Sequence, residues 1–245
     1  MAEPILFKVR RIILSAPGVK TLYLVPVVPG SFNFDFKPGQ FVNLMIQRPG
    51  EPLMARPYSI SSSPTNKEYL ELTIKILEGG RFTSKVDQLK EGDEVKIGGP
   101  FGRFFFLDEG KMKSLVLIGG GCGTTPFISM VRYINDRRLP IKTTYVYSCR
   151  TPAHILFREE LVRIANKNGN IHLVFTTTRE WPSDWMFETG RINPEMLRKH
   201  VNIDTPGQYY MICGPTEMAN STVRMLKGMG IADEFIISES WGGSA

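Results

Sequence analysis

The feature that most constrains this chain is a strand that runs directly into a glycine-rich loop and then into a helical pattern. Residues 114–118 form the apolar stretch, residues 119–123 the loop, and apolar residues recur at helical spacing from Ile128 onward. Thr125 suits the N-cap of that helix and Pro126 its first position. Such a helix start offers backbone N–H groups and a positive dipole end to a phosphate. We therefore predict that a dinucleotide diphosphate binds here.

The loop departs from the GxGxxG fingerprint of dinucleotide-binding folds. Gly119 and Gly121 fit its first two glycines, but Thr124 takes the place of the third. Glycines after a strand also occur in tight turns that bind nothing, so the loop taken alone leaves both interpretations open.

The second half of the chain, residues 109–245, alternates strands and helices. This rhythm predicts a doubly wound α/β domain with a five-stranded parallel sheet. The strands are expected at 115–118, 143–147, 171–176, 209–212 and 235–237, and the helices at 126–137, 155–165, 194–200 and 217–229.

The first half, residues 1–108, shows short strands between turn residues and only one short helical pattern, at 82–89. Many short strands at regular spacing predict a closed antiparallel barrel of six strands. The strands are expected at 5–14, 21–25, 41–46, 56–60, 70–76 and 95–97. The polar turn at 108–111 is the expected domain boundary.

Composition narrows the classes of protein that fit. The 245 residues give room for one large domain or two of ordinary size. The net charge of +6 comes from Lys and Arg that are scattered along the chain, which favours an acidic partner or anionic cofactors over nucleic acid. The three cysteines lack CxxC spacing, which argues against a zinc or iron–sulfur centre. Their odd, small number argues against a disulfide scaffold and favours the reducing cytoplasm. With neither a signal peptide pattern nor a membrane-length apolar run, we expect no membrane insertion.

Two clusters in the first half suit phosphate and a planar ring. Arg56 and Tyr58 share one face of a short strand with Ile60 or Ser62, which supplies a cationic fork and a stacking plane. The alternative is an ordinary edge strand. Residues 79–84 form a second glycine turn that opens a helix carrying hydroxyls, a second candidate anion site.

These motifs resemble those of the ferredoxin–NADP reductase superfamily, in which a flavin-binding barrel is joined to a nucleotide-binding domain. Residues 56–59 (RPYS) match its first flavin motif, 72–84 resemble its second, and 119–126 (GGGCGTTP) resemble its GGxGxTP loop. The resemblance implies a set of flavin-binding residues: Arg56, Pro57, Tyr58, Ser59, Thr73, Ile74, Lys75, Gly79, Gly80, Phe82, Thr83, Ser84 and Trp241.

Individual roles follow from the same resemblance. Arg56 would hold the flavin diphosphate, Tyr58 would lie against the isoalloxazine, and Ser59 would sit near flavin N5. Glu239 would be a proton-relaying acid and Trp241 would cover the ring where nicotinamide stacks; the alternative for both is a frayed tail.

The resemblance also implies the residues that bind the pyridine nucleotide. Residues 213–215 match the family's CGP motif, which places Cys213 beside the nicotinamide. The catalytic residues are then Ser59, Cys213 and Glu239, with no metal. The nucleotide-binding residues are Gly120, Gly121, Cys122, Gly123, Thr124, Thr125, Pro126, Ser148, Arg150, Thr178, Arg179, Arg191, Cys213, Gly214 and Pro215.

The choice of coenzyme rests on the ends of the second and third strands. An acidic residue after the second strand would bind the free ribose hydroxyl of NAD, and none is present. Ser148 and Arg150 are there instead, with Thr178, Arg179 and Arg191 able to converge on them. This pattern favours NADP(H) over NAD(H); the alternative is that the arginines are ordinary surface residues.

The resulting hypothesis is an FAD-dependent NAD(P)H oxidoreductase, a reductase component without a fused ferredoxin domain. Hydride would pass from NADPH or NADH to FAD, and electrons would then pass to a separate acceptor, foremost a small acidic ferredoxin. The alternatives are the reductase of an oxygenase or cytochrome system, a flavin or quinone reductase, an electron-transfer subunit of a larger complex, and a non-enzymatic nucleotide-binding module.

Overall fold

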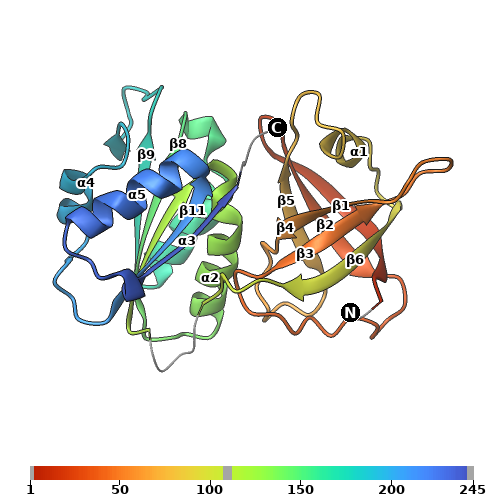
Figure 1. Ribbon diagram of the computed structural model, residues 1–245, viewed down its shortest axis with the longest axis horizontal. Coiled ribbons are helices and arrows are strands. Elements are labelled where there is room, and N and C mark those ends of the chain that lie inside the picture. Colours follow the sequence, from red (N-terminus) through yellow and green to blue (C-terminus); the bar gives the residue numbers. More distant parts are fainter. Residues whose placement is uncertain (1–2, 107–111, 242–245) are drawn as a thin grey trace. The chain divides into compact units, whose positions relative to one another are not determined.

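The computed structural model describes residues 3–106 and 112–241. Contacts divide the chain into two compact units. The first contains the residues up to Phe106 together with Ile128–Tyr133, and the second contains the remainder (Figure 1). The predicted boundary turn at 108–111 lies outside the described residues.

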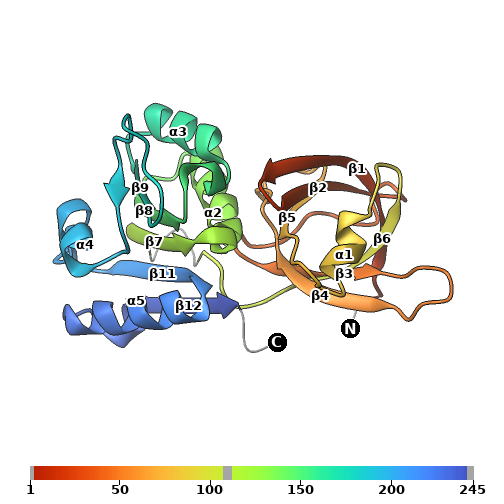
Figure 2. The same ribbon diagram turned by 90° about the horizontal axis from the view of Figure 1, so that it is seen from above.

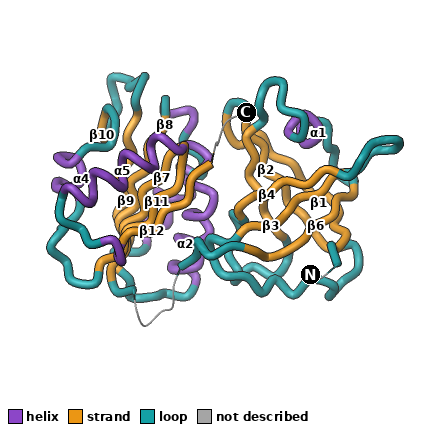
Figure 3. The backbone as a smooth tube through the Cα atoms, in the orientation of Figure 1, coloured by secondary structure: helices purple, strands orange, loops and turns teal. Residues whose placement is uncertain are grey.

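The first unit is the predicted antiparallel barrel of six strands (Figure 3). The sheet order is β4-β3-β6-β1-β2-β5. An isolated antiparallel bridge between Ile60 and Leu72 closes it, and Ser61 N–H donates to the Glu71 carbonyl at 2.9 Å. The elements are β1 (Ile5–Ala16), β2 (Val19–Pro26), β3 (Phe41–Ile46), β4 (Met54–Ser59), β5 (Leu70–Lys75), the five-residue helix α1 (Thr83–Asp87) and β6 (Glu94–Phe101).

Alternation along the strands directs one set of side chains into the barrel. In β3, Val42, Leu44 and Ile46 are buried while their neighbours are half-buried. β5 departs from this pattern, because it also buries Glu71 at 1% exposure. The Arg132 guanidinium, which belongs to the same unit, contacts this carboxylate at 2.9 Å. The buried charge is therefore paired, as a charge in an apolar interior must be.

The second unit is a parallel α/β sheet in the order β10-β9-β8-β7-β11-β12. Figure 2 shows α3 on one face and α4 and α5 on the other. The elements are β7 (Ser114–Gly120), α2 (Thr124–Asp136), β8 (Lys142–Cys149), α3 (Arg158–Lys167), β9 (Ile171–Thr177), β10 (Glu188–Thr189), α4 (Pro194–His200), β11 (Gln208–Pro215), α5 (Thr216–Gly228) and β12 (Ile236–Trp241), with 3₁₀ turns at Gly121–Gly123, Pro152–His154 and Asp233–Phe235.

The five predicted parallel strands are present, and β10 is an additional sixth strand. It has only two residues and pairs with the end of β9. Gly190 N–H donates to the Thr177 carbonyl at 2.8 Å, and Thr176 Oγ1 donates to the Gly190 carbonyl at 2.7 Å. Contacts between distant segments, rather than local periodicity, thus define this strand.

The core of the second unit forms where β7 buries all seven of its residues between neighbouring strands. A continuous apolar run is what a parallel strand covered on both faces requires. Across the described ranges, none of the helices combines the length and apolar composition needed to span a membrane.

Candidate functional site

The glycine loop is built by close backbone approaches. A Cβ on Gly123 would lie 2.2 Å from the Cys213 carbonyl oxygen, and one on Gly120 would lie 2.3 Å from the Met218 sulfur. Gly121 has open space but a φ of +53°, a region that side-chain-bearing residues rarely adopt. The loop therefore needs glycine at these positions for two different reasons.

The helix after the loop starts earlier than the sequence predicts. A 3₁₀ turn over Gly121–Gly123 leads directly into α2 at Thr124. Thr125 is therefore not the N-cap, and its hydroxyl donates to the Cys122 carbonyl at 3.0 Å. Pro126 is the third residue of α2 and not the first.

Both threonine hydroxyls of the loop are engaged within the protein. Thr124 Oγ1 is hydrogen-bonded to Tyr145 Oη, and both threonines are buried. What this loop can offer a diphosphate is therefore its backbone N–H groups and the amino end of α2, rather than the threonine hydroxyls.

The strand ends of the second unit lie in register at one edge of the sheet. Gly120 pairs with Ser148, and Ser148 with Thr176. Ligands of doubly wound sheets bind at this carboxyl edge. The predicted nucleotide residues on different strands are therefore brought to one edge.

The arginines after β8 and β9 are held side by side by the backbone. Arg179 N–H donates to the Arg150 carbonyl at 2.9 Å, and Thr178 N–H to the Cys149 carbonyl at 3.0 Å. Arg191 follows Gly190, which is bonded to the end of β9. All three guanidinium groups are exposed, and no ion pair within the described part of the chain involves them. They form a cationic rim suited to an anionic ligand.

Thr177 is a residue of this edge that the sequence reasoning missed. Its side chain is fully buried, and its hydroxyl has no hydrogen-bond partner within the ranges that the structure covers. The sequence Thr176-Thr177-Thr178 could have indicated this, because side chains alternate along a strand and Thr177 therefore points to the face opposite that of Thr176 and Thr178.

The CGP motif lies on β11, next to β12. Cys213 is fully buried and pairs in register with Glu239, and Gly214 pairs with Ser240. Burial raises the pKa of the Glu239 carboxyl to about 7. This acid can therefore hold or release a proton near neutral pH. Pro215, at the end of β11, is exposed.

On the barrel, β4 brings together a cation and an aromatic ring. Arg56 is exposed, and its guanidinium donates to the Ala55 carbonyl at 2.8 Å. The half-buried Tyr58 ring lies 6.0 Å from the Phe82 ring. Burial raises the pKa of Tyr58 to about 12, while the Arg56 charge acts in the opposite direction. Tyr58 is thus a neutral planar surface beside a guanidinium with no ion pair in the described part of the chain.

Ser59 follows Tyr58 and is 4% exposed. Its hydroxyl has no hydrogen-bond partner among the described residues. An orphaned buried hydroxyl fits a position that a bound group completes. Ser59 therefore fits the flavin site that the resemblance implies.

The second glycine turn is organised by Thr83. Its hydroxyl accepts from Leu77 N–H at 3.2 Å, and a Cβ on Gly80 would meet this hydroxyl at 2.3 Å. Ser84 Oγ donates to the Arg81 carbonyl at 3.1 Å. The hydroxyl of Thr83 thus shapes the turn, and that of Ser84 is exposed.

The remaining predicted flavin residues divide by accessibility. Thr73 and Ile74 are buried, and the Thr73 hydroxyl bonds to Thr21 and Ser61 inside the barrel. Any contact that these two make with a ligand is therefore through backbone atoms. Pro57, Lys75 and Gly79 are exposed. Trp241 ends β12 with its backbone opposite Pro215, and its side chain lies outside the described residues.

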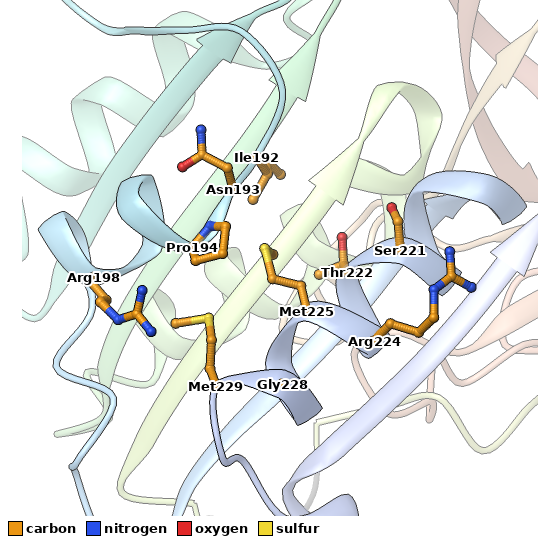
Figure 4. A pocket seen from close by; sticks show the side chains of 10 residues that line it. All are labelled: Ile192, Asn193, Pro194, Arg198, Ser221, Thr222, Arg224, Met225, Gly228 and Met229. Carbon is orange, nitrogen blue, oxygen red and sulfur yellow. The ribbon is translucent and has the colours of Figure 1, made fainter.

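The predicted site residues lie outside two hollows of the surface. A groove of about 580 Å³ lies between α4 and α5, lined on its floor by Met225 and Met229 (Figure 4). A second hollow of about 610 Å³ lies beside Phe32 and Phe34. Neither contains a predicted site residue. A search of the described residues finds no group of three or more His, Cys, Asp or Glu that could hold a metal ion.

Comparison with known proteins assigns the two halves of the chain to different domain families. Residues 27–106 match the oxidoreductase FAD-binding domain, and residues 117–224 match the oxidoreductase NAD-binding domain.

Individual relatives agree with this assignment. The glycine betaine monooxygenase reductase subunit of Pseudomonas aeruginosa is 37% identical over 199 residues, which are 80% of this chain and 54% of that protein. Sulfhydrogenase 1 subunit gamma of Pyrococcus furiosus is 35% identical over 83% of this chain and 68% of that protein. The chain spans about half the length of the first of these relatives.

A solved structure shares the fold at lower identity. It is a ferredoxin NADP+ reductase from Neisseria gonorrhoeae with bound FAD and NADP. The TM-score is 0.83 at 23% identity, and the match covers 98% of this chain and 99% of that one.

Proposed function

This chain belongs to the ferredoxin–NADP reductase superfamily of FAD- and NAD(P)-binding oxidoreductases, and on that premise we propose that it oxidises NAD(P)H and delivers the electrons to a separate acceptor. Bound FAD supplies the chemistry, because it takes two electrons with a hydride and can release them singly. The protein supplies binding, orientation and hydrogen bonds.

The observation that carries this proposal is the Ser59 hydroxyl, buried and without a partner in the described residues, at the end of the strand that bears Arg56 and Tyr58. Ser59 would donate a hydrogen bond to the flavin ring, and Tyr58 would offer that ring an aromatic face. Arg56 binds the flavin diphosphate together with the backbone of residues 79–84.

The residues of the second unit position the nucleotide. The glycine loop binds its diphosphate, and Cys213 and Gly214 lie beside the nicotinamide. Glu239 holds a proton at its carboxyl near neutral pH, which its raised pKa supports. The resemblance assigns Trp241 to the flavin face where nicotinamide stacks, and its side chain lies outside the described residues.

NADP(H) is the preferred coenzyme in this proposal. The guanidinium groups of Arg150, Arg179 and Arg191 are exposed along the carboxyl edge and form no ion pair with another described residue, which suits a 2′-phosphate. The test compares kcat/KM for NADPH and NADH. Arg150→Gln should lower kcat/KM for NADPH at least about ten-fold and leave NADH within about two-fold. Arg163→Gln, an exposed arginine of α3, is the matched control. Equal or better kcat/KM with NADH in the unaltered protein would contradict the preference.

The acceptor is a one-electron partner, and we place a small acidic ferredoxin first. The net charge of +6 supports an acidic partner. The relative named a monooxygenase reductase subunit supports a second candidate, the reductase component of an oxygenase system. The three cysteines are thiols rather than disulfides, which suits a reducing cytoplasm.

The proposal is tested by anaerobic spectroscopy of the purified chain, followed by a screen of acceptors. Yellow protein whose flavin band bleaches on adding NADPH or NADH supports it, and acid release of the flavin distinguishes FAD from FMN. Colourless protein that takes up neither flavin on reconstitution would instead favour a non-enzymatic module.

A further inference from the structure

Two tyrosines of β8 lie fully buried next to the glycine loop. Tyr145 and Tyr147 are two residues apart and therefore project from the same face of the strand. Both are 0% exposed, and their rings stack with centroids 5.6 Å apart and planes 8° apart.

The two hydroxyls reach the two ends of the 3₁₀ turn. Tyr147 Oη donates to the Gly121 carbonyl at 3.0 Å, where the turn begins, and accepts from Leu156 N–H at 3.3 Å. Tyr145 Oη is hydrogen-bonded to Thr124 Oγ1, where the turn passes into α2. Each end of the turn is thus tied to β8.

A packing role explains the rings but not the hydroxyls. Phe127 and Phe175 pack edge-on against the pair at 5.7 and 6.3 Å, and a phenylalanine would fill the same space. A buried phenol needs a hydrogen-bond partner, whereas a buried phenyl ring does not. Each phenol makes a hydrogen bond at one end of the 3₁₀ turn, which points to a role in the geometry of that turn.

The Gly121 contact sets the direction of the next amide. In a planar trans peptide the C=O of one residue and the N–H of the next point in opposite directions. Because Tyr147 holds the Gly121 carbonyl inward, the N–H of Cys122 is directed away from the tyrosines. Burial raises the pKa of the Cys149 thiol to about 11, although hydrogen bonding with Tyr147 and with the Gly121 backbone acts to lower that pKa. The thiol is therefore a neutral neighbour of the same turn.

We propose that Tyr145 and Tyr147 are positioning residues for the pyridine nucleotide, whose hydroxyls fix the glycine turn in the shape that binds the diphosphate. This inference rests on the proposed function. If the turn already has its binding shape, no binding free energy is used to order it. The hydroxyls therefore increase the affinity for the nucleotide. Burial keeps both phenols neutral, so neither places a negative charge beside the diphosphate.

The test uses Tyr147→Phe in the flavin-loaded protein. The dissociation constant of the oxidised nucleotide should rise about 5- to 20-fold, with KM for the reduced form rising in parallel and kcat within about two-fold. A merely structural role would lower thermal stability without this split between KM and kcat.

Tyr210→Phe is the matched control. Tyr210 is 1% exposed, and its hydroxyl accepts from Gln208 Nε2 at 2.7 Å on β11, away from the loop. The control deletes a buried phenol hydroxyl from the same sheet and should leave nucleotide affinity within about two-fold. An equal loss in both variants would overturn the inference.

Tyr145→Phe and Thr124→Val provide a second test, which also serves if Tyr147→Phe fails to fold. They remove opposite partners of one hydrogen bond, so each should weaken binding similarly and the double variant little further. Nucleotide affinity within about two-fold of the unaltered protein in all folded variants would overturn this inference alone. Failure of the unaltered protein to bind NAD(P)(H) would overturn the proposed function and this inference with it.

Discussion

At the scale of single residues, two buried hydroxyls are informative because nothing in the described chain satisfies them. Ser59 ends β4 of the barrel, and Thr177 ends β9 of the parallel sheet. A buried polar group without a partner costs about 1–3 kcal/mol. Each lies beside residues that the sequence assigns to a ligand, so a bound cofactor is the natural partner for both.

Ser59→Ala should separate stability from function. Without flavin, the free energy of unfolding should stay equal or rise by about 1 kcal/mol, because an unsatisfied hydroxyl is removed. With flavin, reduction by NAD(P)H in stopped-flow measurements should slow at least about ten-fold.

Ser61→Ala is the control for this prediction. The Ser61 hydroxyl donates to the Glu71 carbonyl at 3.0 Å, so its loss should lower stability by about 1 kcal/mol. Unchanged flavin reduction in Ser59→Ala would show that its hydroxyl does not contact the reacting ring.

Glu239 should make stability depend on pH. Its pKa is about 7 in the folded protein against an ordinary 4.5, so the folded state binds the proton more tightly. Stability should therefore fall as pH rises from about 4.5 to about 7, by about 1–3 kcal/mol. Chemical denaturation across this range should show a flatter profile for Glu239→Gln. Identical profiles would mean that the carboxyl titrates as it does in the unfolded chain.

At the scale of elements, the junction of β7, the 3₁₀ turn and α2 depends on contacts with β11 and β8. Gly123 approaches the Cys213 backbone, while the tyrosines of β8 bind both ends of the turn. The loop is therefore shaped by two neighbouring strands as well as by its own glycines.

Gly123→Ala and Gly121→Ala should differ in the size of their effect. The added methyl of Gly123→Ala meets a backbone carbonyl that cannot move freely, so destabilisation of about 2–4 kcal/mol is expected. Gly121→Ala has open space and only an unfavourable φ, which costs about 1 kcal/mol. Thermal unfolding monitored by circular dichroism measures both. A milder effect at Gly123 than at Gly121 would contradict this account of the loop.

β10 illustrates an element held by side chains from elsewhere. Glu188 accepts from Lys199 Nζ at 2.6 Å and contacts His200 Nε2 at 2.7 Å, both on α4. These hydrogen bonds lower the pKa of Glu188. Because Arg191 lies just beyond β10, the contacts that hold β10 on the sheet also help to position Arg191 at the carboxyl edge.

At the scale of the whole molecule, the proposed function divides between the two units. The parallel sheet binds the two-electron donor NAD(P)H, and the barrel binds FAD, which can release electrons singly to the acceptor. The net charge of +6 should attract an acidic electron acceptor. Charge complementarity acts on the association rate and is screened by salt.

Electron transfer to an acidic ferredoxin should therefore slow as salt increases. Raising NaCl from about 50 mM to about 500 mM should lower the second-order rate constant at least about ten-fold, because the Debye length shortens. Free riboflavin, a neutral acceptor, is the control and should change by less than about two-fold. Equal salt dependence for the two acceptors would argue against electrostatic recognition.

Local pattern was enough to predict most of the architecture. The apolar run at 114–118 and the helix at Pro194–His200 depend on periodicity and helix-start chemistry that are readable in a few residues. β10 was missed because two residues carry no period, and the early start of α2 because it follows from the packing of glycines against β11. The free hydroxyl of Thr177 was missed because its environment comes from several strands.

Closure of the barrel through Ile60 and Leu72 has a consequence for self-association. An open sheet margin exposes unpaired amides and carbonyls that can capture a strand from another molecule. In the barrel, the bridge between Ile60 and Leu72 joins the two end strands at one point and shortens this margin. The parallel sheet ends at the two-residue β10 on one side and at the six-residue β12 on the other. Of the two outermost strands of the parallel sheet, β12 offers the longer row of backbone groups to a strand of another molecule, so added charge along β12 should reduce self-association at high concentration.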